Sequence, residues 1–427
     1  MTPRLPEGQP WPADARLDPD LAEAWVGRPL SLYVHVPFCR VRCGYCDFNT
    51  YTVGFGAGAE PGSYAASVLA EADLAVRALD EVGLGDSSLG GGSPGGRQAS
   101  TVFFGGGTPT MLDAEELARI LCGLGERFGV TPGAEVTTEA NPETVTRESL
   151  ARLARAGFTR VSFGMQSAVP RVLATLDRTH TPERVPQVVE WAREAGLDVS
   201  VDLIYGTPGE TLADWETSLN AAVEMAPDHV SAYALVVEEG TRMGARVAHG
   251  ELPEPDPDDE ATKYEMTDAI LGEAGYRWYE ISNFARVEPG EADVVGTDLR
   301  HASRHNLAYW RDWDWWGLGP GAHSHVGRLR WWNVKHPGAY AGRVRNGRSP
   351  ASAGERLDDA TRELERVMLA VRTAQGVVLD DVDNREGVAG LVADGLVEPG
   401  PASEGRIVLT LRGRLLADHV TRVLTDT

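Results

Sequence analysis

The chain has 427 residues, of which 42% are hydrophobic and 24% charged, a balance typical of a globular protein with two or three domains. Its formal net charge of −23 argues against nucleic acid as a main partner, because a phosphate backbone requires a basic surface. Residues 1–30 lack the apolar segment of a secretory signal, and no run approaches the ~20 apolar residues of a membrane-spanning helix. We therefore expect a cytoplasmic protein, with peripheral membrane contact left open.

Between residues 30 and 240, short apolar or β-branched runs alternate with amphipathic stretches such as 115–128 and 182–195. The six strand-like runs are 32–38, 101–104, 135–139, 160–165, 198–204 and 229–237. This alternation predicts βαβ units and a parallel sheet, hence the α/β class. Six units fall short of the eight of a closed barrel, so we predict an open partial (β/α)6 TIM-like barrel. Its ligands should bind at the C-terminal ends of the strands.

The rest of the chain is divided by changes in composition. Residues 83–96 are a Gly/Ser loop, and the Pro/Asp segment 252–259 precedes a predicted helix at 260–273. The tail reads as two helices, a strand at 406–411 and a helix at 413–424, an order that resembles a winged helix. We expect four parts: an N-terminal extension (1–29), the partial barrel (30–250), an α+β His/Trp-rich extension that is a candidate heme-binding region (251–350), and a winged-helix-like domain (351–427).

Three of the four cysteines, Cys39, Cys43 and Cys46, follow the first predicted strand. Thiolates are the usual ligands of iron–sulfur clusters, and three of them leave one iron of a [4Fe–4S] cluster open to a small chelating molecule. A structural zinc site is the alternative, but zinc loops more often pair two C-x-x-C elements, and no second pair exists. The fourth cysteine, Cys122, is predicted to be an inert thiol in the core.

Other candidate binding residues lie at the ends of predicted strands or in the loops after them. Gly105–Gly107 and Thr108 follow the second strand, where glycines let a ligand approach the backbone, although a tight turn would explain them equally well. Glu139 closes the third strand, where its carboxylate could bind a ribose hydroxyl or an ammonium group, or be a plain charge on the rim. Gln166, Arg178 and Asp202 occupy equivalent positions further along the chain.

The spacing C-x-x-x-C-x-x-C resembles the signature of the radical S-adenosylmethionine (SAM) superfamily. Together with YVHVPFC at 33–39, GGGTPT at 105–110, GMQ at 164–166 and DLIYG at 202–206, it resembles the oxygen-independent coproporphyrinogen III oxidase family over nearly the whole chain. The resemblance implies a [4Fe–4S] cluster on the three cysteines and SAM as a further cofactor. It also implies the residues of the SAM pocket: Tyr33, Gly106, Gly107, Thr108, Glu139, Gln166, Arg178 and Asp202.

Two departures distinguish the chain from the oxidases of that family. Phe48 stands where they carry a fourth cysteine, and only about thirty residues precede the first strand, where they carry a longer segment. The chain instead resembles the HemW-like heme-chaperone branch, whose mark is the motif HNxxYW, present here as residues 305–310.

The chemistry of the segment around this motif is compatible with heme. The neutral imidazole of His305 is a good axial ligand, and the aromatic residues Tyr309, Trp310, Trp313, Trp315 and Trp316 could stack on a porphyrin. Residues 296–336 carry six basic and three acidic side chains, a local reversal of charge that would suit propionates. The bases are Arg300, Arg304, Arg311, Arg328, Arg330 and Lys335. His323 and His325 compete with His305 as ligands, and the segment could equally be packing or a helix cap.

We therefore predict a heme chaperone that binds heme, a [4Fe–4S] cluster and exchangeable SAM, and delivers heme to an unidentified acceptor protein, for which a membrane-associated protein is one candidate. The alternative is an enzyme, a coproporphyrinogen III oxidase that converts coproporphyrinogen III to protoporphyrinogen IX by oxidative decarboxylation. A nucleic-acid-modifying radical SAM enzyme is a third hypothesis, against which the net charge argues. The sequence leaves open whether the chain is an enzyme at all.

Overall fold

The structure is a computed structural model that describes residues 7–18, 28–52, 60–83 and 98–425. The predicted Gly/Ser loop, except for Gly83, lies outside these residues. So do residues 1–6 and 19–27 of the predicted N-terminal extension.

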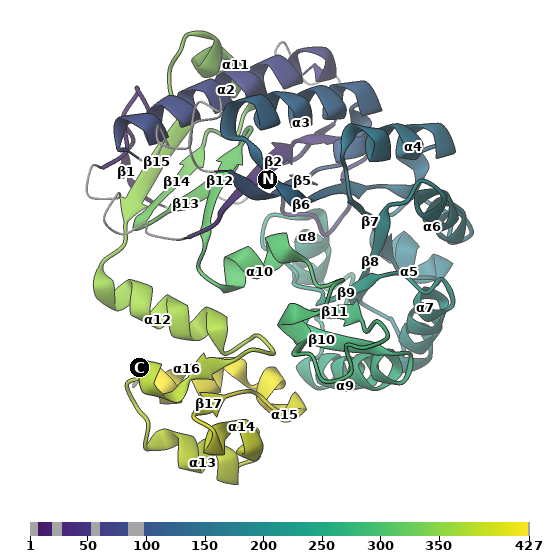
Figure 1. Ribbon diagram of the computed structural model, residues 1–427. Helices are drawn as coiled ribbons and strands as arrows, with labels where there is room; N and C mark the ends of the chain where they lie inside the picture. Colours follow the sequence, from purple (N-terminus) through teal and green to yellow (C-terminus); the bar gives the residue numbers. More distant parts are fainter. Residues whose placement is uncertain (1–6, 19–27, 53–59, 84–97, 426–427) are drawn as a thin grey trace.

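A curved sheet of thirteen strands forms the body of the protein (Figure 1). At its centre are the six predicted parallel strands, in the order in which they occur in the chain. They are β2 (Leu30–Val36), β5 (Ala99–Gly106), β6 (Val130–Ala140), β7 (Arg160–Gln166), β8 (Asp198–Tyr205) and β9 (His229–Ala234). The prediction of an α/β fold built on an open, mostly parallel barrel is confirmed.

The two faces of these strands differ because side chains alternate along a strand. Val102, Phe104 and Val161 are fully buried in the main hydrophobic core on the outer face. Helices cover that face in Figure 1. They include α2 (Pro61–Glu81), α3 (Ala114–Phe128), α4 (Arg147–Ala156), α6 (Arg184–Glu194) and α7 (Leu212–Glu224). The concave face instead carries polar side chains, among them Thr137 and Ser162. The inside of the barrel is therefore built to hold polar ligands.

The segment 251–350 continues the same sheet at both edges. β12 (Asp314–Leu318) pairs parallel with β2, and β11 (Asn283–Arg286) pairs antiparallel with β9. Beyond them lie β13 (His323–Val326), β14 (Leu329–Asn333), β15 (Ala351–Arg356) and β1 (Gln9–Pro10) on one side, and β10 (Tyr276–Glu280) on the other. A short parallel pair, β3 (Phe38–Cys39) with β4 (Tyr51–Thr52), stands apart. The other α-helices described before residue 351 are α5 (Pro170–Thr175), α8 (Arg242–Ala248), α9 (Pro257–Glu273), α10 (Arg304–Trp310) and α11 (Pro337–Arg345).

The C-terminal residues form a second body with its own hydrophobic core. It contains α12 (Asp359–Ala370), β16 (Val377–Val378), α13 (Gly387–Ala393), α14 (Pro399–Ser403), β17 (Arg406–Ile407), α15 (Leu411–Leu415) and α16 (Ala417–Thr425). The predicted strand 406–411 is shorter than expected. The hydroxyl of Thr410 accepts a hydrogen bond from Gly413 N–H and caps α15, so a helix begins where the strand was predicted to continue.

The prediction that Cys122 is a core thiol is wrong. Cys122 is exposed on α3, and its Sγ lies 3.7 Å from Oε1 of Glu126, one turn further along the helix. The neighbouring Leu121 and Leu124 face the core instead, as the 3.6-residue period of the helix requires. Among the described residues, no helix is long and apolar enough to cross a membrane.

Candidate functional site

The inside of the barrel contains a cavity of about 1070 Å³. This volume is at the upper end of the range of pockets that bind small molecules. The cavity runs from the loop of the three cysteines, at the C-terminal ends of the parallel strands, to α10, which contacts their N-terminal halves. We call these the cluster end and the α10 end.

The cysteine loop, residues 39–48, is held in place by backbone hydrogen bonds at Gly44. Its N–H donates to the carbonyl of Leu176 at 3.3 Å, and its carbonyl accepts from the N–H of Met243 at 2.9 Å. A Cβ at position 44 would lie 2.4 Å from a carboxylate oxygen of Asp177, so a larger residue would require that side chain to move. Tyr45 packs in the apolar cluster that these loops share. The loop that carries the cysteines is therefore anchored by the protein itself.

The three thiols lie within electrostatic reach of one another. Burial, together with the nearby Cys46 and Cys43, raises the pKa of Cys39 to about 12, although a contact with the Thr108 hydroxyl and the charge of Arg178 oppose the rise. Nη1 of Arg178 lies 3.6 Å from Sγ of Cys43. Three thiolates in one loop, of which that of Cys39 is buried, would need positive charge to be stable, and iron supplies it. The donor set thus fits a metal cluster.

The glycine segment lies directly beside this loop. The N–H of Gly107 donates to the carbonyl of Val36 at 2.8 Å, and the N–H of Thr108 to the carbonyl of Phe38 at 2.7 Å. Gly106 has a φ of +108°, and a Cβ there would lie 2.6 Å from the His35 ring. Glycine is therefore required at position 106 by conformation and by packing.

Two buried carboxylates line the wall beyond the glycines. Glu139 accepts a hydrogen bond from Gly106 N–H at 3.1 Å, and burial, followed by the charge of Asp202, raises its pKa to about 8. Burial also raises the pKa of Asp202, although that side chain accepts from Ser162 at 2.9 and 3.0 Å. Raised carboxylate pKa values in a cavity are typical of binding sites for cationic or hydroxyl-bearing groups.

Two further residues have buried polar atoms that lack a partner among the described residues. Gln166 is in the left-handed region at φ +61° and donates through Nε2 to Tyr45 Oη at 3.3 Å, but its Oε1 has no hydrogen bond. Arg178 donates through Nη2 to the Gly164 carbonyl at 2.9 Å, and its Nε is likewise free. Both residues line the cavity, so a bound ligand could satisfy these atoms.

All the residues that the sequence singled out for SAM line this one cavity. They are Tyr33, Gly106, Gly107, Thr108, Glu139, Gln166, Arg178 and Asp202, and Cys39, Cys43 and Cys46 line it with them. The structure thus brings together residues that are up to 169 positions apart, as expected for loops and strand ends that meet at one edge of a parallel sheet.

His305, the predicted heme ligand, lies at the opposite end of the cavity and is almost fully buried. Its Nδ1 is hydrogen-bonded to the Thr101 hydroxyl at 2.7 Å and its Nε2 to the Tyr309 hydroxyl at 2.9 Å, while its ring stacks on Phe103 at 5.0 Å. Burial lowers the pKa of His305 to about 4, so the ring is neutral. Both nitrogens of the ring are therefore occupied by protein groups.

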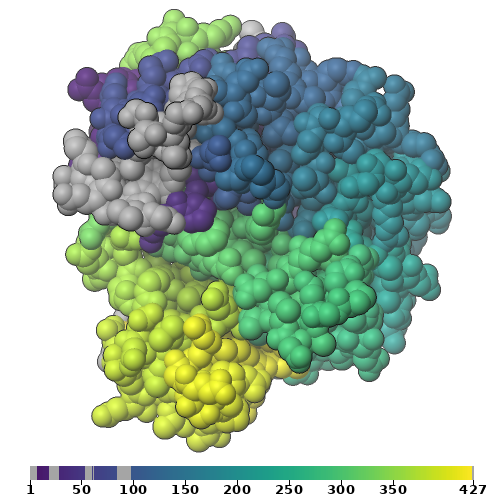
Figure 2. Space-filling model, in the orientation of Figure 1, coloured from purple at the N-terminus to yellow at the C-terminus, as the bar shows by residue number. Residues whose placement is uncertain are grey.

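Helix α10 is fixed to the barrel by a residue that the sequence analysis missed. The buried carboxylate of Glu135, on β6, accepts from Ser303 Oγ at 3.2 Å and from the N–H groups of Arg304 and His305 at 3.1 and 3.0 Å. An acidic side chain is favourable at a helix N-terminus, where free N–H groups point outward. Because Glu135 and α10 are far apart in the chain, no local pattern could have revealed this cap. In Figure 2 the green segment that contains α10 lies between the blue barrel and the yellow C-terminal residues.

The other groups predicted to bind heme are mostly engaged elsewhere. Arg304 donates to the Gly133 carbonyl at 2.7 Å, and Arg311, Arg328 and Arg330 form ion pairs with Asp298, Asp359 and Glu365. His325 is buried and bonded to the Gly327 carbonyl, and His323 is exposed and stacked on Trp332. Trp316 is buried in the main core, and Trp315 packs edge-on against Tyr309.

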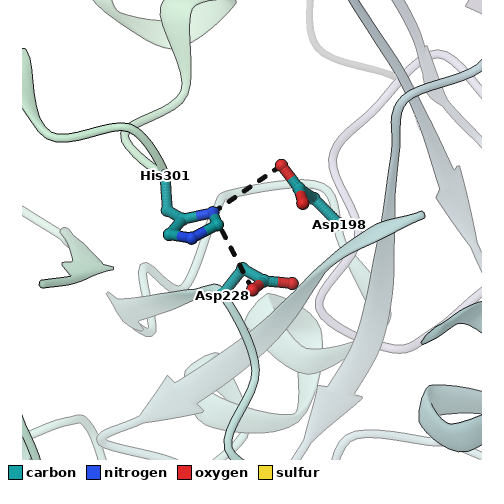
Figure 3. A group of neighbouring side chains, drawn as sticks. All are labelled: Asp198, Asp228 and His301. Atoms are coloured by element: carbon teal, nitrogen blue, oxygen red, sulfur yellow. Dashed lines mark ion pairs between the residues drawn. The ribbon is translucent and has the colours of Figure 1, made fainter. Parts of the chain in front are cut away.

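His301 lies in a buried ionic network at the α10 end (Figure 3). Its Nδ1 faces Asp198 at 3.6 Å and Asp228 at 3.8 Å, and its Nε2 lies 2.8 Å from Glu288. His301, Asp198 and Asp228 have the spacing of a metal site, but the guanidinium of Arg286 lies 2.6 Å from one oxygen of Asp228 and the Val199 N–H donates to the other. The network is thus already balanced by protein cations.

Comparison with known proteins agrees with this geometry. Residues 33–222 match the model of the Radical SAM superfamily. The chain is 46% identical to "Heme chaperone HemW" of Mycobacterium tuberculosis over 93% of its own length and 95% of that protein, and 31% identical to the Bacillus subtilis protein of the same name over 91% and 97%. In three dimensions it resembles the radical SAM enzyme coproporphyrinogen III oxidase (HemN) of Escherichia coli, with a TM-score of 0.76, 23% identity, and coverage of 96% and 94%. That likeness shows a shared fold, whereas the identity to the curated relatives is decisive: the chain belongs to the radical SAM superfamily and, within it, to the HemW heme chaperone family.

Proposed function

We propose that this protein carries a [4Fe–4S] cluster and SAM at the cluster end of its cavity, and that it binds heme and delivers it to an acceptor protein. The observation that supports this function best is the 46% identity to a heme chaperone over almost the whole chain. The cysteine loop and the orphaned polar atoms beside it supply an independent argument for the cofactors.

Cys39, Cys43 and Cys46 would each hold one iron, and the amino and carboxylate groups of SAM would chelate the fourth. When bound, the reduced cluster supplies one electron for cleavage of a bond to the sulfonium of SAM. Gly106 and Gly107 leave room for the methionine part of SAM, and the free Gln166 Oε1 and Arg178 Nε offer one acceptor and one donor. Glu139 and Asp202 would face its cationic and hydroxyl-bearing groups.

A chaperone is favoured over an oxidase by the residue at position 48. Phe48 lines the cavity with 58% of its surface exposed, and it cannot act as the thiol that the oxidases place two residues after the third ligand. We therefore propose that the protein carries heme and does not convert coproporphyrinogen III to protoporphyrinogen IX.

The sequence predicts His305 as the iron ligand, but both nitrogens of its ring are hydrogen-bonded to protein groups, and the proposed function does not depend on this residue. To bond iron through Nε2, the ring would have to give up its hydrogen bond with Tyr309. Neutral imidazole is the form that binds iron, and the low pKa of His305 ensures that form.

The test uses anaerobically reconstituted full-length protein. We expect about one heme per chain from a Soret titration, a cluster spectrum by electron paramagnetic resonance that SAM perturbs, and no formation of protoporphyrinogen from coproporphyrinogen III with SAM and a reductant. Clear turnover of coproporphyrinogen would replace the chaperone with the oxidase. A protein that holds the cluster but binds no heme would end the chaperone proposal and leave the radical SAM site.

A further inference from the structure

The mouth of the cavity at the cluster end carries an unusual concentration of exposed apolar side chains. Eight large apolar side chains are exposed among the described residues, and four of them line this one cavity. They are Val41, Phe48, Tyr233 and Val236, with exposed fractions between 43% and 65%. We call these four residues the apolar rim. Single exposed apolar residues are ordinary on protein surfaces, but a cluster at the mouth of a cavity indicates a binding site.

Two segments that are distant in the chain form the rim. Val41 and Phe48 belong to the cysteine loop, and Tyr233 and Val236 lie at and just beyond the end of β9. The two segments are packed together, because Tyr45 of the loop lies in one apolar cluster with Leu235 and Val237. Val236, between those two, is turned the other way and is 65% exposed. The fold therefore brings the four side chains to the same mouth.

The mouth carries charges of both signs, and among them Arg40 is a cation available to a carboxylate of a ligand. Arg40 is exposed, lines the cavity and has no ion pair with any described residue. Arg42 is partly engaged with the Cys46 carbonyl, and Asp47 and Glu238 line the cavity as well. Acidic groups of a ligand would be directed toward Arg40 and away from those two carboxylates.

We propose that the apolar rim holds one face of heme, with a propionate directed toward Arg40, and that the porphyrin does not reach His305. This inference rests on the proposed heme-chaperone function and assigns its cargo to one end of the cavity. A porphyrin is flat and largely apolar, and aromatic and aliphatic rim residues would cover its face. The cavity, at about 1070 Å³, has room for a second ligand beside SAM. At the α10 end, in contrast, both nitrogens of His305 are already hydrogen-bonded.

The experiment compares heme affinity, by Soret titration, for Phe48→Asp, Val236→Asp, Arg40→Glu and His305→Ala in the full chain. Leu364→Asp, which changes an exposed apolar residue on α12, is the matched control. Cluster content and the response of the cluster spectrum to SAM are measured on each sample. Val236 lies outside the cysteine loop, so Val236→Asp decides the question if Phe48→Asp disturbs the cluster.

We expect Val236→Asp and Phe48→Asp each to weaken heme binding roughly ten-fold or more, because a charge would replace apolar contact area. Arg40→Glu should weaken it less, and more strongly at low salt, since exposed charge pairs are screened. Leu364→Asp and His305→Ala should bind heme like the wild type.

If Phe48→Asp and Val236→Asp both bind heme with wild-type affinity, the inference is wrong. This holds whether or not the apolar rim binds a protein partner instead. Loss of binding in His305→Ala alone assigns heme to the α10 end and leaves the chaperone function standing. A wild-type protein that binds no heme refutes the proposed function itself.

Discussion

The two ends of the barrel are built in opposite ways. At the cluster end, buried polar atoms of Gln166 and Arg178 have no partner in the part of the chain that the structure describes, and apolar side chains such as Phe48 are exposed. At the α10 end, His305 and Glu135 bond to neighbouring protein groups, and their side chains are buried. Both ends contain residues that the sequence marks as functional.

The difference separates residues that bind a ligand from residues that shape its cavity. A site that awaits a ligand leaves donors and acceptors free, because the ligand will satisfy them, whereas a structural element satisfies its own. Gln166 and Arg178 at the cluster end meet this criterion, whereas His305 and Glu135 at the α10 end do not. Arg160, which also lines the cavity, is an exception at the α10 end, because its Nε and Nη1 have no hydrogen bond among the described residues. The helix that carries the HNxxYW motif closes the other end of the cavity and contributes His305, Asn306 and Tyr309 to its wall.

The largest effect should come from the thiols of the cluster end. Cys43→Ala should abolish cluster assembly, because three protein ligands are the minimum that holds three irons and leaves one for SAM. Iron content and electron paramagnetic resonance of the reduced protein measure the loss. Cys122→Ala, which changes an exposed thiol on α3, should leave both unchanged. A wild-type spectrum in Cys43→Ala would mean that the ligands are assigned wrongly.

At the α10 end the largest effect should be on stability. Glu135→Ala should lower the free energy of unfolding by about 3 kcal/mol, because it orphans two backbone N–H groups of α10 and leaves Arg160, 3.5 Å away, without its buried partner. Urea denaturation followed by circular dichroism measures this. Glu148→Ala, which removes an exposed carboxylate paired with Arg152, should change stability by less than about 0.5 kcal/mol. Equal effects in the two variants would show that Glu135 does not fix α10.

The variant Tyr309→Phe, with a smaller expected effect, tests whether α10 only lines the cavity or also supplies a ligand to heme iron. The variant frees Nε2 of His305 and removes one buried hydrogen bond, which should cost about 1 kcal/mol of stability. If His305 is part of the wall, the heme affinity should stay within about three-fold of the wild type, a change of less than ~0.7 kcal/mol. A clear increase in heme affinity, with a Soret shift, would show that the released imidazole bonds iron.

The smallest effect should be a pH dependence at the ionic network of the α10 end. Burial opposes protonation of His301, but Asp198 and Glu288, and then the charge of Asp228, outweigh it and raise its pKa. Arg286 and Arg160 also face this network. A group whose pKa is higher in the folded state stabilises the fold below its unfolded pKa of about 6.5, and this contribution is lost as pH rises through the folded pKa.

His301→Gln should therefore lower stability by about 1 kcal/mol at pH 6 and by less at pH 9, measured by urea denaturation at both values. His249→Gln, at an exposed histidine after α8, is the control and should show no such difference. A stability loss in His301→Gln that is the same at both pH values would mean that His301 is not charged in the folded protein.

Local patterns in the sequence determined much of this protein. The alternation of apolar runs and amphipathic segments predicted the six parallel strands. The spacing of Cys39, Cys43 and Cys46 and the glycines after the second strand predicted residues that meet in one cavity. These predictions succeed because side-chain periodicity and the common edge of a parallel sheet depend on neighbours in the chain.

Only the tertiary structure determined which side chains lie next to one another and which are exposed. The charges and aromatic residues in the sequence do not show that Arg311 and Arg330 are paired with Asp298 and Glu365. The sequence also does not show that Cys122 is exposed on its helix. The cap of α10 by Glu135 joins residues more than 160 positions apart, and the apolar rim joins Phe48 to Val236. Such contacts depend on how the sheet curves and closes, because a residue's chemistry gives its capacity to bind but not the partner that the fold places beside it.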